Sequence, residues 1–197
     1  MKNKAVQGDG NVTRLNQLSD DNWKDLKEIV VFGFGRQGKK MYTTLSRDFS
    51  IKAIVDNSPD KQGMRVGDLT VLAFEEAQSL MAKYRVIVTT SQYYYQDIRR
   101  QLSMAGLEEN RDFVMYQQFV TEWYYKYRNR VNVLKTDISL TTICNLRCEN
   151  CMQFLPYWKS GRRGEHSFSE IKTDVDTYFQ CIDYLLDLDV VGGEPFL

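Results

Sequence analysis

The sequence has no long hydrophobic run and no excess of either charge. Its longest apolar segments span a few residues, such as Ile29–Phe32, far short of the ~20 residues that a membrane-spanning helix needs. Residues 1–21 are polar and lack the apolar centre of a secretory signal. Basic and acidic residues number 26 each, which argues against a strongly basic nucleic-acid-binding protein. We therefore expect a cytoplasmic protein with no membrane span and no nucleic-acid partner.

Proline and histidine are also scarce. Three prolines in 197 residues leave little room for long linkers, and 43% hydrophobic residues exclude a fully disordered chain. In a reducing compartment cysteines act as ligands, nucleophiles or core residues before they form disulfides. Three of the four cysteines fall close together, at Cys144, Cys148 and Cys151. This clustering indicates a functional role for the thiols.

Short apolar segments alternate with helical patterns in the first part of the chain. Alternation of this kind predicts parallel βαβ units, so the expected fold class is α/β, with a Rossmann-like parallel sheet domain at residues 1–120. An aromatic and basic linker is expected at 121–131. The expected strands are Ile29–Phe32, Ile51–Val55, Val71–Leu72, Val86–Thr90 and Phe113–Tyr116, with helices at Phe74–Tyr84 and from Ile98 to Gly106.

A glycine-rich loop follows the first expected strand, with Gly33, Gly35 and Gly38 in the run GFGRQG. Glycines there permit a tight turn and a close approach of a pyrophosphate to a helix N-terminus. Asp56 ends the second expected strand, at the distance from the loop where an acidic residue holds a ribose hydroxyl in dinucleotide-binding proteins. These four residues are the candidate cofactor-binding residues of the N-terminal domain.

The stretch Ala53–Gly63, AIVDNSPDKQG, resembles the N-terminal nucleotide-sugar-binding domains of sugar acetyltransferases. It is also similar to the Rossmann-like tails of some sugar-modifying methyltransferases. The resemblance implies a nucleotide-sugar as ligand, and NAD is an equal alternative.

A second alternation of strand and helix occupies residues 132–197. A strand is expected at Thr136–Thr142, a capping box at Ser167 and Glu170, and a second strand at Leu188–Val191. Between them, apolar residues recur at helical spacing, at Ile171, Val175, Tyr178, Phe179, Ile182 and Leu186.

The loop after the first of these strands carries the three clustered cysteines. Three thiolates can hold three irons of a [4Fe–4S] cluster and leave the fourth iron open. Two other interpretations remain: cysteines on one helix face packed in a core, and a zinc site of Cys144, Cys148, Cys151 and His166.

The cysteine spacing, together with Gly192-Gly193-Glu194-Pro195 after the second strand, resembles the radical S-adenosylmethionine enzymes. The resemblance implies that residues 132–197 form the first βα units of a partial (β/α) barrel. It also implies that Cys144, Cys148 and Cys151 bind a [4Fe–4S] cluster. Gly192, Gly193, Glu194 and Pro195 would then contact S-adenosylmethionine.

By this resemblance the protein is an iron–sulfur oxidoreductase that reductively cleaves S-adenosylmethionine to a 5′-deoxyadenosyl radical. Implied partners are an electron donor such as flavodoxin or ferredoxin and a small-molecule or glycan-related substrate. At ~30 residues per βα unit, residues 132–197 hold about two units, so we expect an incomplete barrel that is inactive alone. The rival hypothesis is a non-enzymatic Rossmann-like ligand-binding module with a structural zinc loop.

Overall fold

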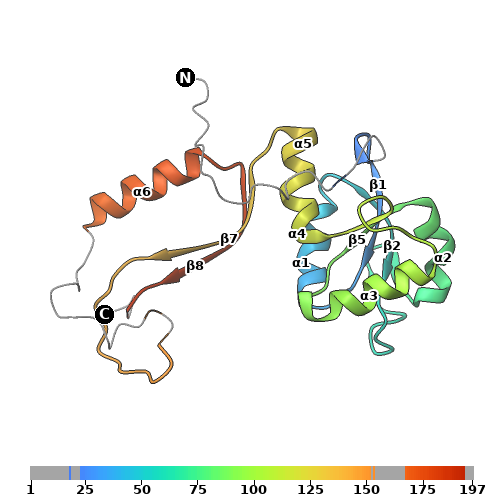
Figure 1. The fold of residues 1–197 in the computed structure, drawn as a ribbon, viewed down its shortest axis with the longest axis horizontal. Helices are drawn as coiled ribbons and strands as arrows, with labels where there is room; N and C mark the ends of the chain where they lie inside the picture. Colours follow the sequence, from blue (N-terminus) through green and yellow to red (C-terminus); the bar gives the residue numbers. More distant parts are fainter. Residues whose placement is uncertain (1–17, 19–22, 152, 154–166, 194–197) are drawn as a thin grey trace. The chain divides into compact units, whose positions relative to one another are not determined.

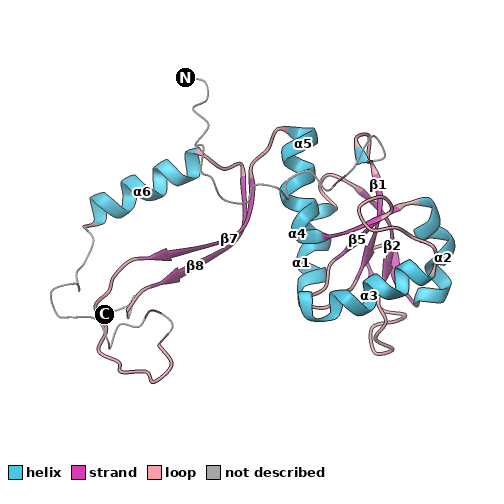
Figure 2. Cartoon of the chain, in the orientation of Figure 1, coloured by secondary structure: helices cyan, strands magenta, loops and turns pink. Residues whose placement is uncertain are grey.

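The structure is a computed structural model that describes residues 18, 23–151, 153 and 167–193. The chain divides into two compact units, Met1–Trp123 and Tyr124–Leu197, and the elements of each are drawn in Figures 1 and 2. In the described residues, no helix is long and apolar enough to cross a membrane.

The first unit is built on a six-stranded sheet with the order β3-β4-β2-β1-β5-β6. All neighbouring strands are parallel except β3 and β4, which form an antiparallel hairpin that the sequence analysis did not predict. The α/β fold with a Rossmann-like parallel sheet is therefore confirmed. The strands are β1 (Glu28–Phe32), β2 (Ser50–Val55), β3 (Arg65–Val66), β4 (Leu69–Leu72), β5 (Arg85–Val88) and β6 (Phe113–Met115).

Helices pack on the two faces of this sheet. The helices α2 (Phe74–Lys83) and α3 (Gln92–Met104) share one hydrophobic cluster with alternate residues of β1, β2 and β5, among them Phe32 and Val55. Helix α1 (Arg36–Leu45) contributes Tyr42 to a second cluster that contains Ile54. Since successive side chains of a strand point to opposite faces, Val55 and Ile54 assign α1 to the face opposite α2 and α3.

The segment after β6 is helical. It comprises α4 (Tyr116–Gln118), the π-helical η2 (Phe119–Trp123) and α5 (Tyr124–Arg128). The side chains of Phe119 and Trp123 are fully buried with Trp23. The Trp123 indole N–H donates to the Trp23 carbonyl at 2.6 Å, and the Trp23 indole N–H donates to the Asn110 carbonyl at 2.8 Å. Residues up to Trp123 thus complete the core of the first unit.

The second unit contains one parallel βαβ arrangement. Strands β7 (Asn132–Ser139) and β8 (Tyr184–Val191) pair in parallel, and α6 (Phe168–Gln180) lies between them in the sequence. The predicted capping box is confirmed, because the Ser167 hydroxyl accepts from the Glu170 N–H and the Glu170 carboxylate accepts from the Ser167 N–H.

The predicted helical stripe runs past the end of the helix. α6 ends at Gln180, and Leu186, which continues the helical spacing, lies in β8 instead. Helical spacing cannot distinguish a helix from the strand that follows it when the turn between them is short and carries no glycine or proline.

Candidate functional site

The glycine loop begins at the carboxyl end of β1, the edge of a parallel sheet where ligands bind in open α/β folds. Gly33 has φ +104°, a left-handed conformation that glycine adopts without steric cost. Its N–H donates to the Val55 carbonyl at 2.7 Å, and its carbonyl accepts from the Thr89 hydroxyl at 2.6 Å. The loop is thereby tied to the residues that end β2 and follow β5.

Gly38 is required where α1 crosses the loop. A Cβ on Gly38 would lie 1.9 Å from the Gly33 carbonyl oxygen, so no larger residue fits without a backbone shift. Gly35 differs, because its φ is −76° and the nearest atom to an added Cβ is the Lys61 Nζ, at 3.9 Å. A Cβ at Gly35 would therefore meet only the end of a flexible side chain and no backbone atom.

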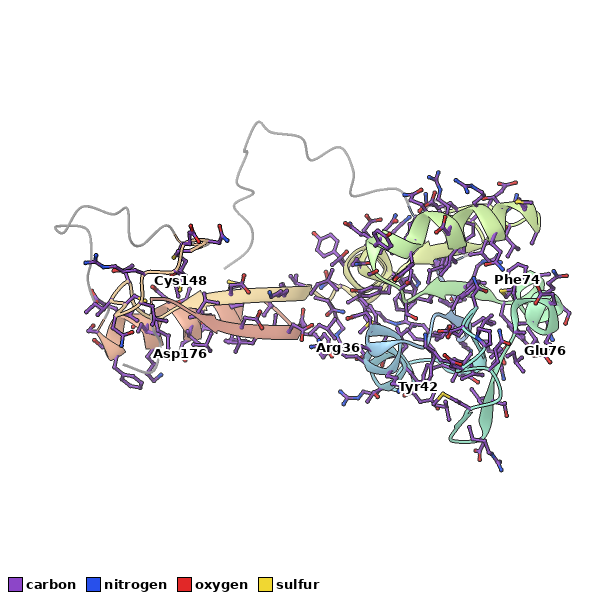
Figure 3. The ribbon with its side chains drawn as sticks, turned by 90° about the horizontal axis from the view of Figure 1, so that it is seen from below. Arg36, Tyr42, Phe74, Glu76, Cys148 and Asp176 are labelled. Carbon is purple, nitrogen blue, oxygen red and sulfur yellow. The ribbon has the colours of Figure 1, made fainter. Side chains whose placement is uncertain are left out.

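Helix α1 begins at this position, beside the Lys61 ammonium. Gly35 is its N-cap, no side chain among the described residues caps it, and its first turn holds no acidic residue. Arg36 is the first helical residue, and its side chain extends from the start of α1 in Figure 3. Unpaired amides and the helix dipole make such an N-terminus favourable for an anion.

Asp56, the residue directly after β2, is buried and already has several partners. Its carboxylate accepts the Phe34 N–H at 2.6 Å and the Ser58 N–H at 2.8 Å. The Lys61 ammonium lies 3.0 and 3.2 Å from its two oxygens. The carboxylate therefore holds the glycine loop and the turn after β2 together, and a ribose hydroxyl would have to compete with these contacts.

Lys61 is the site residue that the sequence analysis missed. It lies in the turn that follows Asn57-Ser58-Pro59-Asp60, whose residue types indicate a turn but not its direction. In the structure the turn brings the Lys61 ammonium back to Asp56 and close to Gly35. A lysine five residues after the acidic residue, beyond a proline-containing turn, is the signal that could have identified it.

The three clustered cysteines do not form a metal centre in the structure. No group of three or more His, Cys, Asp or Glu side chains that could hold a metal ion occurs within residues 18, 23–151, 153 and 167–193. Cys144 and Cys151 are half-buried, and Cys148, labelled in Figure 3, is exposed. The Cys144 thiol accepts the Leu146 N–H at 3.4 Å. His166, the fourth member of the zinc hypothesis, lies outside the described residues.

Gly192 and Gly193 allow β8 to end against the chain that follows β7. An added Cβ would lie 2.8 Å from the Thr141 carbonyl oxygen at Gly192 and 1.8 Å from the Ile143 carbonyl oxygen at Gly193. The Gly193 N–H donates to the Thr141 carbonyl at 2.7 Å. These contacts are a structural reason for both glycines that needs no cofactor. The remaining residues of the motif, Glu194 and Pro195, lie outside the described residues.

Comparison with known proteins gives one family match and several distant structures. The family model "C2185-like, N-terminal" matches residues 25–113, fewer than half of the chain. No curated protein matches the chain. Among solved structures, a Rex-family repressor in complex with NADH is 22% identical with a TM-score of 0.37, over 46% of this chain and 45% of that one. The chain thus spans about half the length of that structure.

Two further solved structures are named as a UDP-sugar dehydrogenase and a putative epimerase. UDP-D-quinovosamine 4-dehydrogenase from Vibrio fischeri is 20% identical over 42% of this chain and 75% of that one, with a TM-score of 0.37. A putative epimerase from Bacteroides thetaiotaomicron is 19% identical over 66% of this chain and 59% of that one, with a TM-score of 0.32.

The assignment to the radical S-adenosylmethionine enzymes is wrong on these findings. The family model that matches is a different one, and the described cysteines gather no metal-binding group. The iron–sulfur and radical-enzyme predictions for Cys144, Cys148 and Cys151 fall with it. A cysteine spacing and a Gly-Gly-Glu-Pro run report only local sequence, and the contacts of Gly192 and Gly193 explain part of that pattern by packing.

Proposed function

We propose that the N-terminal unit is a ligand-binding module that takes a pyrophosphate-containing nucleotide at Gly33–Gly38. The ligand class covers dinucleotides such as NAD and nucleotide-sugars, since both present a pyrophosphate to the loop. The module needs neither a metal nor a catalytic side chain for this role.

The observation that carries the proposal is the arrangement around Gly35. The loop is compact where Gly33 and Gly38 meet, whereas a Cβ at Gly35, the N-cap of α1, would meet only the Lys61 ammonium. Gly35 thus lies beside both the amide end of a helix and the Lys61 ammonium, which is ion-paired with Asp56. A pyrophosphate that accepts hydrogen bonds from the backbone N–H groups at the start of α1 would suit this arrangement.

Calorimetry of the full chain with NAD⁺, NADH, ADP, UDP and a UDP-sugar tests the proposal. The wild type is expected to bind at least one of these probes, and Gly35→Val is expected to lose that binding. Gly35 has extended φ and ψ angles of −76° and −162°, which a valine adopts readily. Its side chain would lie beside Lys61 without straining the loop.

Lys52→Met provides the matched control. Lys52 is the third residue of β2 and is ion-paired with Glu28 at 2.7 Å, so its replacement changes the net charge without touching the loop. Binding in Lys52→Met should equal that of the wild type. Absence of heat with every probe in the wild type would reject the proposal and leave the fold as a scaffold.

Enzymatic activity and nucleic-acid binding are separate questions. The absence of a nucleic-acid partner, expected from the balanced charge of the sequence, stays a prediction that a gel-shift assay with the full chain would check.

A further inference from the structure

Lys61 has the geometry of an anion-recognising residue. An ammonium carries three hydrogens, and two of them are directed to the Asp56 oxygens, at 3.0 and 3.2 Å. In the described part of the chain, the Lys61 ammonium has no other partner. It lies 3.9 Å from the Cβ position of Gly35, the N-cap of α1. The third hydrogen is therefore available at the place where the proposed pyrophosphate would lie.

Asp56 holds this ammonium in place. The carboxylate is itself fixed by the Phe34 and Ser58 N–H groups, and the Gln62 side-chain amide donates to the Asp56 carbonyl at 3.0 Å. These three hydrogen bonds hold Asp56 and the turn from which Lys61 extends. A lysine that is already oriented loses less side-chain entropy when it binds a ligand than a free surface lysine does.

The same contacts reduce the capacity of Asp56 to bind a ribose. Both carboxylate oxygens accept hydrogen bonds within the protein, and the carboxylate charge is paired with Lys61. In dinucleotide-binding folds, a free acidic residue at this position selects the ribose hydroxyls. Here a ribose hydroxyl would gain a bond only by displacing an existing one.

We infer that Lys61 recognises the ligand through its phosphate charge, and that Asp56 acts as a positioning residue for Lys61 rather than as a ribose-binding residue. The inference rests on the proposed nucleotide site and makes it specific. The ligand class is one in which the pyrophosphate carries the affinity and the ribose 2′-hydroxyl does not.

The first arm of the test compares Lys61→Met with Lys52→Met in the full chain. Both lysines pair with a carboxylate, and their side chains are 34% and 33% exposed. Calorimetry uses ADP or UDP, whichever the wild type binds more tightly. Lys61→Met should bind about tenfold more weakly, as loss of a partly screened, charge-assisted hydrogen bond implies, while Lys52→Met should bind as the wild type does. Lys61→Arg should recover most of the affinity.

The second arm needs no variant, so it does not depend on how well Lys61→Met folds. The wild type should bind the 2′-deoxy form of the same diphosphate within about twofold of the ribose form, because Asp56 contributes no bond to the hydroxyl. Equal binding by Lys61→Met and the wild type, or a loss of tenfold or more with the 2′-deoxy probe, would overturn the inference. If the wild type binds neither diphosphate nor any other probe, the proposed function itself fails.

Discussion

The Asp56 carboxylate accepts the backbone N–H of Phe34 at 2.6 Å, so the residue after β2 holds the middle of the loop after β1. The two residues are far apart in the sequence and belong to different strand ends. Their contact is buried, and it fixes the backbone directly before Gly35. The candidate site is therefore a property of two strand ends rather than of the glycine motif alone.

Asp56→Asn should destabilise the first unit by about 1–3 kcal/mol. An asparagine keeps one acceptor, but its amide group would face either the Phe34 or the Ser58 N–H, which leaves a buried donor unpaired. The Lys61 ammonium also loses its ion-pair partner. Urea denaturation followed by tryptophan fluorescence measures the change. An Asp56→Asn variant as stable as the wild type would show that this network contributes nothing to folding.

Gly38→Ala and Gly35→Ala should differ sharply in stability, although they lie in one motif. The added methyl group meets the Gly33 carbonyl at 1.9 Å in the first variant and only the end of a lysine side chain in the second. Overpacking against backbone costs about 1–3 kcal/mol or more, whereas Gly35→Ala should cost under about 1 kcal/mol. Thermal unfolding of both variants provides the comparison. Equal losses would mean that the helix does not approach the loop so closely.

Trp123→Phe should destabilise the first unit, even though Trp123 lies outside the segment that the family model matches. The variant removes the donor to the Trp23 carbonyl and shrinks a fully buried side chain, for which we expect a cost of about 1–3 kcal/mol. Tyr125→Ala, at a side chain that is 65% exposed, is the control and should change stability by less than about 0.5 kcal/mol. Chemical denaturation of both full-length variants checks the difference; matching midpoints would remove Trp123 from the core.

Asp112 should make the stability of the first unit depend on acid pH. Burial alone would raise the pKa of Asp112, but hydrogen bonds from the Arg111 side chain and the Glu108 N–H, with the charges of Arg111 and Arg85, hold this pKa below its usual value. The contribution is present above the unfolded-state pKa and is lost as pH falls through the lower, folded-state pKa.

Asp112→Asn is therefore expected to be less stable than the wild type at pH 7, with a gap that closes as the solution is acidified. Below the folded-state pKa the wild-type side chain is protonated and neutral, like asparagine. Urea denaturation at a series of pH values between 7 and about 2 measures the gap. A difference that stays constant over the whole series would show that Asp112 charge is not its source.

Much of the fold could be predicted from the sequence, because buried parallel strands are short apolar runs with turn residues at their ends. Ile29–Phe32 and Ile51–Val55 were placed to within one residue of β1 and β2. The hairpin of β3 and β4 was not predicted, since Arg65–Val66 is too short to show any periodicity. The predicted linker at 121–131 overlaps the end of η2 (Phe119–Trp123), because an aromatic residue such as Trp123 carries no sequence signal of which core it enters.

The candidate site was only partly predictable. Sequence spacing predicts the glycine loop and Asp56, because each comes directly after the end of a strand. Spacing could not reveal that Asp56 is fully engaged, since its partners at Ser58 and Lys61 depend on the path of a turn. The cysteine motif led to the wrong family, because spacing alone does not report whether thiols converge in space.

The most direct test of the central claim is an amide NMR titration of the full chain with ADP or UDP. Binding at the glycine loop should shift the N–H signals of Gly35, Arg36 and Gln37 more than those of residues at the opposite edge of the sheet, where the parallel strands begin. That edge holds a cleft lined by Asp25, Leu26, Lys27, Glu28, Lys83, Tyr84 and Arg85. Shifts concentrated at that cleft, with the α1 amides unchanged at saturation, would contradict the account.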